Sequence, residues 1–158
     1  NSSNSFLLAA DNASVDAYFQ QQRLLLQKAQ QDSRLCRILL NTPAQRSDQS
    51  GSAPWLLDKH YRGFMDDLQN AVTQLIASGG NQWPRTLPNE QSQQFMQRIV
   101  SQMAGTYGPE SLQRYELMSN ENASPDIRCK GLHQLYETIN TQELELRTQL
   151  VRSFFGGS

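Results

Sequence analysis

Long apolar runs, net charge and histidine are all scarce in this 158-residue sequence, and each scarcity argues against a class of function. The longest wholly apolar run extends only from Phe6 to Ala10, whereas a membrane-spanning helix needs roughly 20 such residues. The formal net charge is -1 and the pI is about 6.1, so no global attraction draws the chain to nucleic acid or anionic lipid. We expect no transmembrane segment in this chain and no nucleic-acid partner, while membrane anchoring outside it stays open.

Residues that could hold a metal or carry catalysis are equally sparse. The only histidines, His60 and His133, lie far apart in the chain, and no third ligand accompanies either at a spacing typical of a metal site. Asp66 and Asp67 fit the solvated face of a helix better than a paired acid and base. We therefore expect no metal, no cofactor and no enzymatic activity.

One trio of residues imitates a catalytic arrangement. Cys129, His133 and Glu137 are spaced four apart, so they line up along one face of a helix in the order nucleophile, base, carboxylate. Side chains on one straight helix rarely reach the geometry that nucleophilic attack requires. Our interpretation is a chance alignment, with His133 and Glu137 at the solvent edge of a disulfide.

What the sequence does contain is strong helical periodicity, beginning with residues 14–40. Apolar residues recur there at spacings of three and four, and Gln22 is the one polar residue on the stripe. This pattern predicts one amphipathic helix of about 26 residues and roughly 39 Å. The apolar positions are Val15, Tyr18, Phe19, Leu25, Leu26, Ala29, Cys36, Leu39 and Leu40.

A second periodic stretch covers residues 54–78. Pro54 suits the first position of a helix, and Gly79-Gly80 supplies a residue that can adopt the positive φ common after a helix end. We expect the helices over 14–40 and 54–78 to form a long antiparallel hairpin. The polar segment 42–53 between them is predicted to be a mobile loop, and residues 1–11 a flexible N-terminal arm.

Shorter helices are predicted for the C-terminal half. Asn89 is placed to cap the first of them, Gly108-Pro109-Glu110 to begin the next, and Ser124-Pro125-Asp126 gives the clearest start signal in the chain. A last helix is expected before Gly156-Gly157. The predicted fold is thus all-α: residues 1–158 form a single-domain bundle of about five to six helices, in which the shorter C-terminal helices pack on the hairpin.

The only two cysteines, Cys36 and Cys129, both fall on apolar helix faces. A disulfide between them would close a loop of about 92 residues, for which the chain-entropy model gives about 4 to 5 kcal/mol. Arginine or lysine flanks each cysteine, which favours the thiolate. We favour the disulfide, while two reduced core cysteines, or a reactive or metal-bound thiol, stay open as alternatives.

The start of the chain and its composition bear on where the protein acts and what it does. The chain does not begin with methionine, and a mature end after signal cleavage or an edge trimmed behind an anchor would favour an exported protein. Arginine outnumbers lysine and glutamine is abundant, a bias typical of proteobacterial chains. We expect a periplasmic or otherwise extracytoplasmic protein that binds another envelope protein, such as an adaptor, inhibitor or immunity-type factor. The alternative is an extracytoplasmic ligand-sensing bundle of a membrane receptor, with a small molecule between its helices.

Four residues are candidates for partner binding because they lie in loops or near helix ends. They are Trp55, Trp83, Arg85 and Tyr107. Aromatic residues in such positions either close the core or anchor a partner. Closing the core is the commoner role, and the sequence leaves both open.

Overall fold

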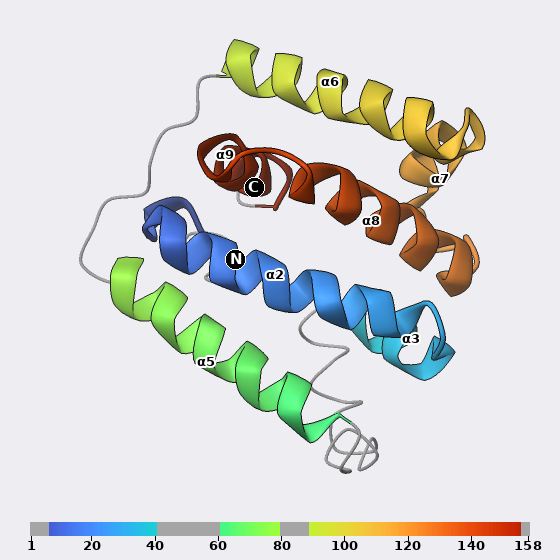
Figure 1. The fold of residues 1–158 in the computed structure, drawn as a ribbon. Helices are drawn as coiled ribbons and strands as arrows, with labels where there is room; N and C mark the ends of the chain where they lie inside the picture. The colour runs from blue at the N-terminus through green and yellow to red at the C-terminus, as the bar shows by residue number, and fades with distance from the viewer. Residues whose placement is uncertain (1–6, 41–60, 80–88, 156–158) are drawn as a thin grey trace.

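A computed structural model describes residues 7–40, 61–79 and 89–155, and no strand occurs among them. These residues form seven helices of eight residues or more, which confirms the all-α prediction with slightly more helices than expected (Figure 1). Their bounds are α2 Asn12–Ala29, α3 Ser33–Leu40, α5 Arg62–Gly79, α6 Asn89–Tyr107, α7 Glu110–Leu117, α8 Pro125–Asn140 and α9 Leu144–Phe155.

The predicted hairpin is present as α2 and α5, which lie side by side and run antiparallel (Figure 1). At one end the backbone N–H of Asp11 donates to Ser78 Oγ at 3.3 Å. At the other end Lys28 Nζ lies 5.7 Å from the centroid of the Phe64 ring. Residues 54–60 of the predicted second helix lie outside the described residues.

The prediction of one continuous helix over 14–40 is wrong in one respect, because the helix is interrupted between Ala29 and Ser33. Asp32 causes the break: its Oδ1 accepts the backbone N–H of Arg34 at 3.0 Å, which is how a capping residue starts a new helix. Tyr61 then donates its hydroxyl to Asp32 Oδ2 and ties the start of α5 to this point. The guanidinium of Arg34 also donates to both carboxylate oxygens of Asp32. These side-chain hydrogen bonds, followed by the one from Tyr61, lower the pKa of Asp32 from 3.8 to about 2, against the opposing effect of burial.

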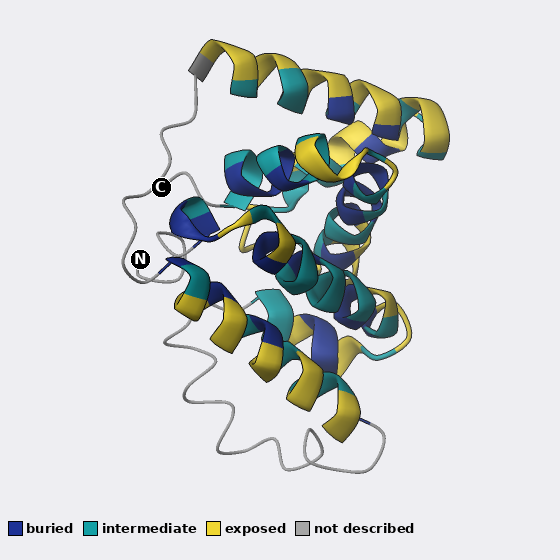
Figure 2. Cartoon of the chain, turned by 60° about the vertical axis from the view of Figure 1, so that its left-hand side comes forward, coloured by how far each residue is buried: buried dark blue, intermediate teal, exposed yellow. Residues whose placement is uncertain are grey.

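The core lies where α8 and α9 pack between α2 and α6, and each helix turns its exposed residues outward (Figure 2). Phe19 stacks on Tyr136 with the ring centroids 5.0 Å apart. Leu7 and Ala10, which fall in the predicted flexible arm, are buried in this core, whereas residues 1–6 and the predicted loop 42–53 lie outside the described residues. The other core residues are Val15, Leu26, Leu75, Ile99, Met103, Leu135, Ile139, Leu150 and Val151.

Two arginines of α9 fasten that helix to the N-terminal segment. Arg147 forms a bidentate ion pair with Asp16, with nitrogen–oxygen distances of 2.7 and 2.9 Å. Arg152 is only 2% exposed and donates to the backbone carbonyl oxygens of Leu7 and Ala10.

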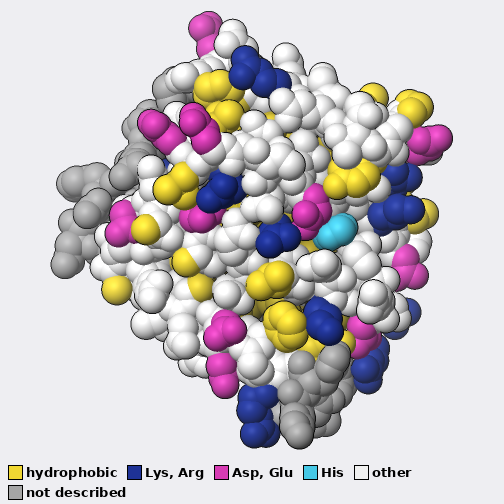
Figure 3. Space-filling model, viewed as in Figure 1, with side chains coloured by type: hydrophobic (Ala, Val, Ile, Leu, Met, Phe, Trp, Pro, Cys, Tyr) yellow, Lys and Arg dark blue, Asp and Glu magenta, His cyan; other side chains and the backbone are white. Residues whose placement is uncertain are grey.

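On the face that Figure 3 shows, acidic and basic side chains are interspersed rather than segregated, in keeping with the net charge of -1.

Close contact between α7 and α8 depends on Gly131, where a Cβ atom would lie 2.8 Å from the carbonyl oxygen of Arg114. We expect Gly131→Ala to lower the free energy of unfolding by about 1–2 kcal/mol, because the clash exceeds the gain in helix propensity. Gly105→Ala in α6 is the matched control, since a Cβ there meets nothing within 4 Å. That control should raise stability by up to about 1 kcal/mol. Urea unfolding of both variants tests this, and an equal effect of the two substitutions would contradict it.

Candidate functional site

The predicted disulfide joins α3 to α8. The Sγ atoms of Cys36 and Cys129 are 2.01 Å apart and the two Cα atoms 6.0 Å apart. Both cysteines are buried, at 0% and 1% exposure, in a small apolar cluster between the end of α2, α3 and the start of α5. The two cysteines thus lie at the distance that the predicted disulfide requires.

The trio that imitates a catalytic arrangement is engaged in other contacts. Cys129 is in the disulfide. Glu137 Oε1 lies 3.1 Å from Arg23 Nη1 on α2 and 3.5 Å from His133 Nε2 on its own helix. Glu137 therefore links α2 to α8, and the three side chains do not form a nucleophilic site.

His133 gives the fold a weak dependence on pH. Burial lowers its pKa below 6.5, reinforced by Arg23 and opposed by Glu137. Between the lowered pKa and 6.5 the unfolded chain binds more protons than the folded one, so stability falls as the pH drops through this window and levels off below it. We expect His133→Gln to flatten this part of the profile in urea unfolding between about pH 5 and pH 8. Wild-type and variant profiles of identical slope would contradict the assignment.

The structure describes one of the four predicted partner-binding residues. Tyr107 ends α6 and is half-buried against the main core, where burial, followed by the charge of Glu137, raises its pKa. Its position is that of a residue which closes the core. Trp55, Trp83 and Arg85 lie outside the described residues.

The metal and acid–base candidates can be placed only in part. Asp66 and Asp67 are both exposed on α5, as a solvated helix face requires. His60 lies outside the described residues. Within the described ranges, no three His, Cys, Asp or Glu side chains are close enough together to hold a metal ion.

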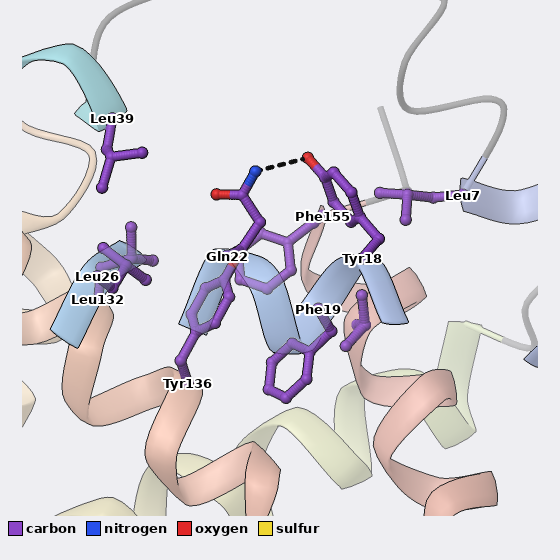
Figure 4. Close-up of a pocket in the computed structure, with 10 residues that line it drawn as sticks. Leu7, Tyr18, Phe19, Gln22, Leu26, Leu39, Leu132, Tyr136 and Phe155 are labelled. Atoms are coloured by element: carbon purple, nitrogen blue, oxygen red, sulfur yellow. Dashed lines mark hydrogen bonds between the residues drawn. The ribbon is translucent and has the colours of Figure 1, made fainter. Parts of the chain in front are cut away.

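The feature that sequence analysis did not locate is a cavity of about 230 Å³ between α2, α3, α8 and α9 (Figure 4). Leucine, valine and aromatic residues make up most of its lining, polar atoms form about half of the surface that it exposes, and none of the described lining residues is charged. The lining residues are Leu7, Tyr18, Phe19, Gln22, Leu26, Leu39, Leu132, Tyr136, Val151 and Phe155.

Aromatic rings and one carboxamide give this cavity its chemistry. Phe155 lies against Tyr136 with the ring centroids 5.1 Å apart, and Phe19 stacks on Tyr136 as well. Gln22 Nε2 donates to the Tyr18 hydroxyl at 3.2 Å, and the carboxamide oxygen is directed away from that hydroxyl (Figure 4). The one sequence signal for the site was Gln22 itself, the single polar residue on an apolar stripe.

A second depression lies on the surface between α6 and α7. It is an open groove of about 550 Å³ with Met96, Val100 and Tyr115 as its apolar part and Gln93, Gln97 and Ser101 as its polar part. None of the lining residues in the described part of the chain is charged. It is more open to solvent than the cavity between α2, α3, α8 and α9, which is itself only partly enclosed.

No family model, curated protein or solved structure matches this chain. Within the described ranges, none of the helices has the length and apolar character needed to cross a membrane. Proposals about function therefore depend on the cavity, the groove and the disulfide.

Proposed function

We propose that this protein binds a small, largely apolar molecule in the cavity between α2, α3, α8 and α9. The observation that carries the proposal is a pocket between four helices, lined mostly by leucine, valine and aromatic residues, beside which the Gln22 carboxamide donates to the Tyr18 hydroxyl. Apolar pockets with a few directed polar groups are the usual form of small-molecule sites. An engineered apolar cavity of about 150 Å³ already binds benzene, so about 230 Å³ accommodates a somewhat larger molecule.

The site also links distant parts of the described chain. Leu7 and Phe155 lie near the two ends of the described chain, and both line the cavity together with Leu39 at the end of α3. An occupant would therefore contact the N-terminal turn and the last turn of α9 at once. This arrangement suits a sensing module, in which binding changes how firmly these elements pack.

The disulfide supports an extracytoplasmic place of action. Structural disulfides persist mainly in oxidising compartments such as the bacterial periplasm, and Cys36–Cys129 is buried and joins helices that are far apart in sequence. We therefore propose a non-enzymatic binding module that acts in such an oxidising compartment. Trapping thiols in living cells before lysis tests the location, because a cytoplasmic chain would carry two free thiols.

The binding proposal is tested by filling the cavity with a larger side chain. Leu39 is half-buried in the lining, so Leu39→Trp should occupy the space with little change elsewhere. Saturation-transfer NMR with toluene as the probe should give a signal for the wild type and lose it in Leu39→Trp.

The matched control is Leu112→Trp, because Leu112 is 40% exposed on α7 and lies outside the cavity. This variant should retain the toluene signal. Absence of binding to the wild type, or equal binding to both tryptophan variants, would refute the proposal.

The groove between α6 and α7 favours a second candidate function, binding of another envelope protein. Methionine and tyrosine are enriched at protein interfaces, and an uncharged groove fits an apolar side chain presented by an amphipathic segment. A photoreactive residue at Gln97 should give a discrete protein adduct in cells that is lost in Val100→Glu. The adduct should persist in Ile76→Glu, whose site is 43% exposed on α5. An adduct insensitive to Val100→Glu would contradict this candidate.

A further inference from the structure

We infer that protonation of His133 transfers the Glu137 carboxylate from Arg23 on α2 to His133 on its own helix α8, so that acidification weakens the link between the two helices. Glu137 Oε1 lies 3.1 Å from Arg23 Nη1 and 3.5 Å from His133 Nε2. Two basic groups thus meet at one acceptor oxygen. Only the contact with Arg23 joins different helices, so a change of partner by Glu137 turns a link between helices into a contact within one.

The ion pair of Arg23 with Glu137 is one end of a hydrogen-bonded row between α2 and α8. Arg23 Nε donates to Gln20 Oε1 at 2.9 Å, and Gln20 Nε2 donates to Asn140 Oδ1 on α8 at 2.8 Å. Gln20 and Asn140 are carboxamides, whose charge does not change with pH. The row therefore has a neutral contact between the helices at one end and a titratable contact at the other.

Partial burial makes the titratable end both accessible and effective. The side chains of Arg23, His133 and Glu137 are 21%, 23% and 27% exposed, so solvent reaches all three. Charge interactions at partly buried positions are screened by salt much less than those at the open surface. Histidine is also the one side chain whose ordinary pKa allows a change of charge between about pH 5 and pH 8.

A positive charge on His133 acts on its two neighbours in opposite directions. It attracts the carboxylate of Glu137 and repels the guanidinium of Arg23, and both effects oppose the contact between α2 and α8. Burial lowers the pKa of His133, opposed by Glu137 and reinforced by Arg23, so the change of partner falls below pH 6.5.

The other helices that pack on α8 bear less directly on His133. Tyr107 of α6 lies close enough to Glu137 that burial, followed by the carboxylate charge, raises its pKa, and it stays neutral in acid. Arg37 of α3 and Lys130 of α8 are exposed to solvent. One arginine on each of α3, α7 and α9 has a partner of its own, in the pairs Arg34–Asp32, Arg114–Gln134 and Arg147–Asp16.

The consequence of the change of partner is looser packing of α2 on α8 in acid. Both helices also line the cavity, α2 through Gln22 and Leu26 and α8 through Leu132 and Tyr136. Acidification therefore alters the walls of the cavity as well. The switch operates whether or not a molecule occupies that space.

A double-mutant cycle with Arg23→Gln and Glu137→Gln, followed by urea unfolding, measures the coupling between the two side chains. We expect this coupling to be at least about twofold weaker near pH 5 than near pH 7.5. The control cycle uses Gln20→Ala and Asn140→Ala, and its coupling should be the same at both pH values because neither side chain titrates. Equal coupling of Arg23 with Glu137 at both pH values overturns the inference.

Repeating the first cycle in a His133→Gln background assigns the effect. The coupling should then no longer depend on pH, whereas a loss in acid that persists without the imidazole comes from another group and overturns the inference. NMR of the wild type serves if a variant does not fold. The Arg23 Nε–Hε resonance should shift with the same midpoint as the His133 ring, below pH 6.5. A resonance that does not follow the ring also overturns the inference.

Discussion

Loss of the Cys36–Cys129 disulfide is expected to destabilise the protein more than any other single change considered. The two cysteines are 93 residues apart in sequence, and the chain-entropy model assigns a loop of this length about 4 to 5 kcal/mol. The total free energy of unfolding of a domain of this size is about 5–15 kcal/mol. We expect Cys36→Ala/Cys129→Ala to lower Tm by roughly 10–20 °C.

Reductant provides the matched control for this prediction. Adding it should lower the Tm of the wild type toward that of the double variant and leave the double variant unchanged. Because Cys36 and Cys129 are at most 1% exposed, reduction requires opening of the fold and should be slow unless denaturant is present. Equal Tm values with and without reductant, after labelling has shown that both thiols are free, would contradict the prediction.

The sequence predicted the helices well because their signals are local. Ser124-Pro125-Asp126 marks the start of α8 at Pro125, and Gly79 is the last residue of α5, as the glycine pair indicated. The break between Ala29 and Ser33 escaped prediction because the apolar pattern continues beyond it with Cys36, Leu39 and Leu40. A single polar residue is tolerated in most helices, and only the hydrogen bonds of Asp32 with Arg34 and Tyr61 show that it begins a new one.

The cavity escaped prediction for a different reason. Its lining comes from the N-terminal turn and from four helices, from Leu7 to Phe155, and every lining leucine or aromatic residue looks like an ordinary core residue in sequence. Whether such residues close completely or leave a space depends on side-chain packing between helices. Gln22 alone departed from the pattern, but a polar residue on an apolar stripe does not reveal what it faces.

Removing the Arg152 side chain is the second change with a large expected effect. Arg152 Nε donates to the carbonyl oxygen of Leu7 at 3.1 Å, Nη2 to that of Ala10 at 2.7 Å, and Nη1 to Asn12 Oδ1 at 2.8 Å. Each buried acceptor left without a donor costs about 1–3 kcal/mol. We expect Arg152→Met, which keeps most of the apolar stem, to lower the free energy of unfolding by about 3 kcal/mol and Tm by roughly 6–12 °C.

Arg98→Met on the exposed face of α6 is the matched control; since Arg98 lies 5.7 Å from the centroid of the Phe95 ring, it should change stability by no more than about 1 kcal/mol. Arg152→Lys should recover only part of the loss, because an ammonium group cannot reproduce the planar fork that reaches three acceptors. Hydrogen exchange should localise the effect to the N-terminal turn. Since Leu7 in that turn also lines the cavity, Arg152→Met should weaken toluene binding as well. If Arg152→Met is as stable as the wild type, α9 does not hold the turn through this side chain.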